Sequence, residues 1–177
     1  MKPSANAIVL KCAAVWNSLR GAWMAYFVFL DLRSLARVGD KGPYVGIGVD
    51  SSLLVTIGAM PLKFLGILAG FRFGLTGETT VEITATLAYC LVAIGLWRRL
   101  RVIKPLALLL WSFEALLLAS YVSYAFFTSL VPWSELRSVA IFSWLLFLGL
   151  YGMSTVYLMQ KNTASLFGQN LKPAIEG

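Results

Sequence analysis

Glu114 is the residue whose type and position most suggest chemistry. It lies inside an apolar stretch, LALLLWSFEALLLASY. A carboxylate at that depth in a membrane costs about 2.5–3.5 kcal/mol, so it must face protein or water and have a partner, or be protonated. At helical spacing Trp111, Tyr121 and Tyr124 share a broad face with it. One interpretation is a proton or cation site; the other, which we favour, is an interhelical hydrogen bond that fixes packing, because one acid without visible companions is weak evidence for a site.

Other charged residues interrupt apolar sequence and could form ion pairs. Arg20 is the cation most suited to reach Glu114 if its own segment spans a membrane. Lys63, Arg72 and Glu82 fall at similar predicted depth, so Glu82 could form an ion pair with one of these two cations. Both pairings are hypotheses from depth along the predicted helices alone.

The chain lacks the residues that most catalytic sites and cofactor sites require. The chain has no histidine, which excludes imidazole-ligated haem, histidine metal sites and Ser-His or Cys-His nucleophiles. Cys12 and Cys90 stand alone, without a C-x-x-C motif, and Gly46-Ile47-Gly48 lacks the third glycine of a dinucleotide loop. We therefore expect no catalytic residues, no metal and no cofactor.

The composition indicates lipid as the solvent. Of 177 residues, 59% are apolar and 13% charged, whereas soluble domains are about 45–50% apolar and about 25% charged. Too few polar groups remain to cover a water-exposed surface, and two cysteines cannot staple a secreted domain. The prediction is an all-α, polytopic integral membrane helix bundle that forms one domain over residues 1–177.

Five apolar segments define the expected helices, since a span needs about 20 mostly apolar residues. Lys11 and Arg20 interrupt the first, so it either spans or lies in the interface as an amphipathic helix, which leaves five transmembrane helices or four plus one interfacial helix. Pro61 and Lys63 interrupt the second, for which we expect a kinked span. A short tail, 160–177, follows helices at about 8–32, 51–71, 80–97, 105–131 and 137–159.

Local signals mark the expected helix starts. Thr79 and Glu82 have the T-x-x-E spacing of a capping box. Asp50 precedes the second apolar segment and Ser134-Glu135 the last, as N-caps do.

Gly66, Gly70 and Gly74 form a small-residue ridge at four-residue spacing. In membranes such ridges let helices approach closely. We expect this one to serve packing inside the bundle rather than an oligomer interface.

The net charge of +7 indicates membrane topology and not a nucleic-acid partner, because of where the basic residues lie. The basic residues gather at 33–41, at 98–104 and, in the tail, at Lys161 and Lys172. Cytoplasmic loops collect such residues, so all three groups are predicted on the cytoplasmic side of a bacterial inner membrane, with the C-terminus. The N-terminus is then outside if the first segment spans and inside if it does not.

Three function classes remain. The first is a non-catalytic accessory or scaffold subunit, which contacts membrane lipid and other integral membrane subunits or a second copy of itself. The alternative is a small transporter or channel subunit that binds a proton or cation at Glu114 with Tyr121 and Tyr124. A lipid-modifying enzyme ranks last, because no catalytic motif supports it.

Overall fold

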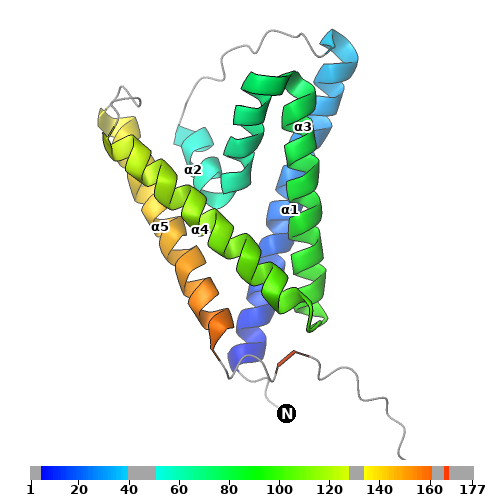
Figure 1. The fold of residues 1–177 in the computed structure, drawn as a ribbon, viewed down its shortest axis with the longest axis vertical. Helices are drawn as coiled ribbons and strands as arrows, with labels where there is room; N and C mark the ends of the chain where they lie inside the picture. Colours follow the sequence, from blue (N-terminus) through cyan, green and yellow to red (C-terminus); the bar gives the residue numbers. More distant parts are fainter. Residues whose placement is uncertain (1–4, 40–50, 128–133, 161–165, 168–177) are drawn as a thin grey trace, which may run out of the picture.

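A computed structural model describes residues 5–39, 51–127, 134–160 and 166–167, and in these ranges the chain forms five α-helices and no strand (Figure 1). The all-α prediction is confirmed. Three helical stretches are long and apolar enough to cross a membrane, Pro61–Trp97, Ile103–Tyr124 and Ser138–Met159. The helices are α1 (Ala5–Val38), α2 (Ser51–Ala59), α3 (Pro61–Trp97), α4 (Ile103–Phe127) and α5 (Ser134–Met159).

Helix α1 is longer than the predicted 8–32 and packs antiparallel to the later part of α3. Near its start, Lys11 Nζ lies 5.6 Å from the centre of the Trp97 ring. A Cβ on Gly21 would lie 3.0 Å from Cys90 Sγ. Farther along, the Asp31 carboxylate lies beside that of Glu82. Since α1 follows its neighbour over this whole length, it belongs to the bundle, and the predicted bounds 8–32 are too short.

The expected kinked span over 51–71 is also wrong, because the chain reverses at Met60. Met60 has a non-helical backbone (φ −138°, ψ 77°), and Pro61 opens α3 where its missing N–H costs no helix bond. Helix α2 runs toward the middle of the bundle and the first part of α3 runs back out (Figure 1). Tyr151 Oη donates to the Ala59 carbonyl (2.6 Å), which satisfies one acceptor freed at the break.

A second reversal lies at Gly74, whose φ of 74° and ψ of −174° belong to a region that essentially only glycine adopts. After it, residues 75–97 return along α1 (Figure 1). Gly66 and Gly70 are buried, and a Cβ on Gly66 would lie 3.3 Å from Glu82 Cγ, so the two arms of α3 approach closely there. The glycines therefore serve internal packing, but Gly74 is the turn itself and not part of a helical ridge.

The predicted capping box at Thr79 and Glu82 is wrong for the same reason. The helix has already begun after Gly74, so amides at these positions have helical partners. Thr79 Oγ1 instead donates to the Leu75 carbonyl (2.8 Å), and Glu82 contacts Lys63.

The last two helices have shifted ends. Helix α4 starts at Ile103 rather than 105, and α5 starts at Ser134 rather than 137. Several predicted features lie outside the described residues. They are the Asp50 cap, the side chains of Ser134 and Glu135, residues 128–131 of the predicted fourth helix, Gly46-Ile47-Gly48, the basic residues Lys41, Lys161 and Lys172, and most of the predicted tail.

Residues 51–73 enter and leave at one end of the bundle, so the basic residues at 33–37 and at 98–104 lie at opposite ends of it. The end of α1, which contains Arg33 and Arg37, lies at the same end of the bundle as the turn between the two arms of α3 (Figure 1). The turn with Arg98 and Arg99 lies at the opposite end, together with the start of α1 and the end of α5. In this part of the chain only residues 75–97 run from one of these ends to the other.

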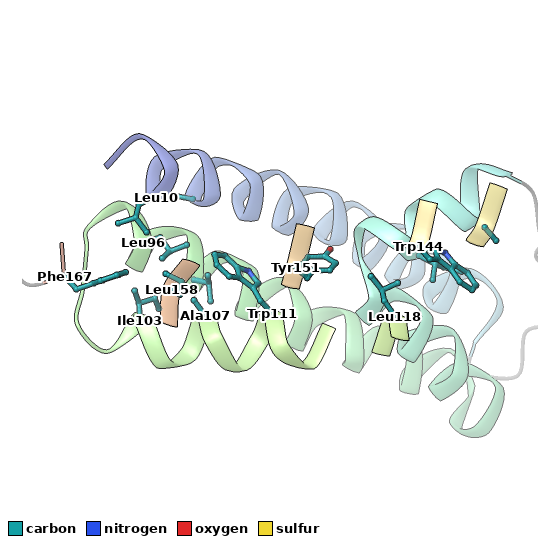
Figure 2. Packing of buried hydrophobic residues seen from close by; sticks show 14 residues of the cluster. Leu10, Leu96, Ile103, Ala107, Trp111, Leu118, Trp144, Tyr151, Leu158 and Phe167 are labelled. Carbon is teal, nitrogen blue, oxygen red and sulfur yellow. The ribbon is translucent and has the colours of Figure 1, made fainter. Parts of the chain in front are cut away.

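The interior combines an apolar strip with buried charge, and the exterior is apolar. Figure 2 shows the strip between the helices, from Ile103, Leu158 and Phe167 at one end to Leu118 and Trp144 at the other. Large apolar side chains cover the outside, among them Phe71, Leu109, Phe142 and Met153, each more than two thirds exposed. Among the described residues, five charged side chains are buried instead, namely Arg20, Lys63, Glu78, Glu82 and Glu114. Water-soluble proteins show the reverse distribution.

Candidate functional site

Arg20, Tyr89 and Glu114 meet in the centre of the bundle, and we call them the central cluster. Arg20 Nη2 forms an ion pair with Glu114 Oε1. The same nitrogen donates to Tyr89 Oη (2.8 Å), and Tyr89 Oη donates to Glu114 Oε1 (2.5 Å). All three side chains are buried. The cluster is therefore a closed triangle that joins α1, α3 and α4.

Aromatic rings surround the guanidinium of the central cluster. Arg20 Cζ lies 4.1 Å from the centre of the Tyr89 ring, 5.0 Å from that of Tyr151 and 6.0 Å from that of Trp16. These are distances at which an aromatic face attracts a cation. Because Tyr151 also bonds to the Ala59 carbonyl, α5 and the end of α2 are tied to the same centre.

The ion pair of the central cluster is not bidentate. Within the described residues, Arg20 Nε and Nη1 and Glu114 Oε2 are buried without a hydrogen-bond partner. Arg20 thus uses one of its nitrogens, although a guanidinium carries five N–H donors. Charge attraction and ring contacts, more than paired hydrogen bonds, hold these side chains together.

A second group of buried charges, the acidic cluster, consists of Asp31, Lys63, Glu78 and Glu82. Lys63 Nζ donates to Glu78 Oε1 (2.9 Å) and forms an ion pair with Glu82. Oxygens of Asp31, Glu78 and Glu82 lie within 4.8 Å of one another. Lys63 Nζ also lies 4.5 Å from the centre of the Phe27 ring. The cluster bridges α1 and both arms of α3, and its acids outnumber its base.

Both ion pairs suggested by depth are present, but the tyrosines expected near Glu114 lie elsewhere. Tyr121 Oη donates to the Pro61 carbonyl (3.4 Å), and Tyr124 is 57% exposed. Trp111 is buried in the apolar strip (Figure 2). Arg72, at the same predicted depth as Lys63, is exposed.

Sequence reasoning missed Asp31, Glu78, Tyr89 and Tyr151. Glu78 could have been found, since it stands one helical turn before Glu82 and faces the same way. Asp31 also interrupts an apolar run, as Arg20 does. Nothing in the sequence distinguishes Tyr89 or Tyr151 from the other tyrosines in apolar segments.

The two clusters offer different chemistry. In the central cluster one acid faces one base, and both charges are balanced. The acidic cluster gathers three carboxylates around one ammonium, and carboxylate oxygens are ligands for protons and for hard cations. Only the acidic cluster therefore has negative charge in excess.

No family model, no curated protein and no solved structure matches this chain. The functional proposal therefore rests on the contacts of its own residues.

Proposed function

We propose that this chain is a small, non-catalytic integral membrane subunit that packs against lipid and other membrane chains. The observation that carries the proposal is the inverted polarity of the bundle. Apolar side chains cover its outside, and the charges of both clusters are buried. Such a surface is stable against lipid, where helices associate through close packing and polar contacts.

The surroundings of Glu114 support a structural role over a cation site. Arg20 and Tyr89 both contact its Oε1, and the carboxylate is fully buried. A positively charged ligand would have to compete with a guanidinium already in contact. The central cluster instead fixes the relative positions of α1, α3 and α4.

In this proposal four helical stretches cross the membrane, α1, residues 75–97 of α3, α4 and α5. Helix α1 has 34 residues and is thus about 50 Å long, enough to cross a hydrocarbon core of about 30 Å. Helix α2 and the first arm of α3 form a re-entrant pair, allowed because their reversal is buried in protein. We assign the turn at Arg98 and Arg99, and the end of α5, to the cytoplasm by positive-inside bias, and this assignment is part of the proposal.

Cysteine labelling tests this topology. In a background without Cys12 and Cys90, single cysteines replace Arg37, Arg101 or Gln160, which are all exposed. An impermeant maleimide should label Arg37→Cys from one side of the membrane, and Arg101→Cys and Gln160→Cys from the other. Labelling of Arg37→Cys and Arg101→Cys from the same side would restore the five-span topology and contradict the re-entrant pair.

Helix α5 offers the clearest place for contact with another transmembrane helix. A Cβ on Gly149 or on Gly152 would meet no atom of the described chain within 4 Å, so both glycines form an outward notch. A small residue at a lipid-facing position allows a second helix to approach closely.

Gly149→Leu is expected to keep the fold and reduce co-purification with other membrane chains, or with a second copy, in mild detergent. The contrasting variant is Gly58→Leu, which should disrupt the fold because a Cβ there would lie 2.8 Å from the Phe147 ring. Size-exclusion chromatography with mass spectrometry of the native particle measures both. Isolation of the unsubstituted chain as a stable monomer would refute the subunit proposal.

A further inference from the structure

The acidic cluster carries a charge imbalance that packing alone does not explain. The charged groups that face it from the described helices are Asp31 from α1 and Lys63, Glu78 and Glu82 from α3. With every acid ionised, three negative charges would face one positive charge. Uncompensated carboxylates are costly where water is excluded, so further neutralisation is needed.

Two oxygens in this cluster lack a hydrogen donor. Glu82 is 0% exposed; its Oε1 contacts Lys63, and its Oε2 has no partner among the described residues. Asp31 Oδ2 is also buried without one. Oxygens of the Asp31 and Glu82 carboxyl groups nevertheless lie within 4.8 Å of each other. Two ionised carboxylates can only accept, so a hydrogen bond between them requires a proton on one.

We propose that the acidic cluster is a proton-binding site in which Asp31 and Glu82 share one proton, while Lys63 neutralises a second carboxylate. The proton comes from water and adds to a carboxylate oxygen, which forms one O–H bond and no other product. Like-charged carboxylates in contact hold a shared proton in this way in other proteins. This site is independent of the proposed role as a subunit.

The contacts of Lys63 favour a proton over a metal ion. Its ammonium already contacts Glu78 and Glu82, and its charge would repel a second cation among the same oxygens. A proton needs only the two donor-free oxygens. Asp31 is partly exposed whereas Glu78 and Glu82 are buried, so Asp31 is the group through which the proton exchanges with water.

Infrared spectroscopy of the protein in lipid nanodiscs tests the site directly. The unsubstituted chain should show a C=O stretching band of a protonated carboxylic acid that shifts in D₂O and weakens as the pH rises. Glu82→Gln and Asp31→Asn should each abolish this band. Both replacements keep the shape of the side chain, and the new amide can donate to the remaining carboxylate, so folding is retained.

Glu114→Gln is the matched control, because Glu114 is just as buried but has its own cation, Arg20. It should leave the band in place. The proposal is overturned if the unsubstituted chain shows no such band at any pH at which it stays folded, or if the band persists in both Glu82→Gln and Asp31→Asn. Calorimetric binding of Mn²⁺ that Glu82→Gln abolishes would also overturn it, in favour of a metal site. Measuring the unsubstituted chain first keeps the test decisive even if one variant misfolds.

Discussion

Arg20→Met should destabilise the folded chain by about 3–5 kcal/mol, which makes it one of the two most damaging single substitutions we predict. It removes the cation from a fully buried Glu114 and leaves only the Tyr89 hydroxyl in contact with that carboxylate. Breaking a buried ion pair from one side costs this much because the remaining charge is desolvated and uncompensated. Thermal unfolding in detergent, followed by tryptophan fluorescence, measures the loss.

The double variant Arg20→Met/Glu114→Met is the control, and it should recover most of the lost stability. Removing both charges leaves no unpaired ion, and apolar replacements of buried ion pairs are often neutral or stabilising. Tyr89→Phe should cost less, about 1.5–3 kcal/mol, because it removes hydrogen bonds to charged groups but no charge. A double variant that is no more stable than Arg20→Met would show that Glu114 does not depend on Arg20.

Helix type and the main pairings could be predicted from sequence because they follow from composition and depth. The apolar runs of α4 and α5 admit no other regular structure in lipid. Isolated charges at similar depth must find one another, which is why Arg20 with Glu114 and Lys63 with Glu82 could be inferred before any contact was seen.

The reversals at Met60 and Gly74 could not be predicted in this way. Hydropathy over 51–73 is the same whether the chain crosses or turns back, and a proline suits a kink as well as a break. What distinguishes the two outcomes is tertiary. The hydroxyls of Tyr121 and Tyr151 donate hydrogen bonds to the carbonyls of Pro61 and Ala59, next to the break. Lys63 contacts two acids of the returning arm.

The missed reversals also affect the topology that was predicted from the basic residues. Positive-inside counting assumed that residues 51–71 cross, so Arg33 and Arg37 were grouped with Arg98 and Arg99. One segment that turns back, instead of crossing, reverses the predicted side of everything before it. The three basic groups therefore could not fix the topology, because the number of crossings between them was not known.

Lys63→Met is expected to have an effect at least as large as Arg20→Met. It would leave Asp31, Glu78 and Glu82 together without their ammonium, in a cluster where two of the three acids are buried. The free energy of unfolding should fall by about 3–5 kcal/mol or more at neutral pH. Size-exclusion chromatography and tryptophan fluorescence of the purified variant measure the folded fraction.

Acidification should restore part of this loss, because protonating the carboxylates removes the uncompensated charge that Lys63→Met creates. Lys63→Met/Glu82→Gln should likewise be more stable than Lys63→Met alone, whereas Lys63→Arg keeps the charge and should stay folded. Arg101 is exposed in the turn that follows Trp97, at the other end of residues 75–97 from Gly74, so Arg101→Met is a suitable neutral control. If Lys63→Met were as stable as the unsubstituted chain at neutral pH, the acids could not depend on the lysine. The reversal of α3 would then have to be held by Gly74 and the close approach at Gly66 alone.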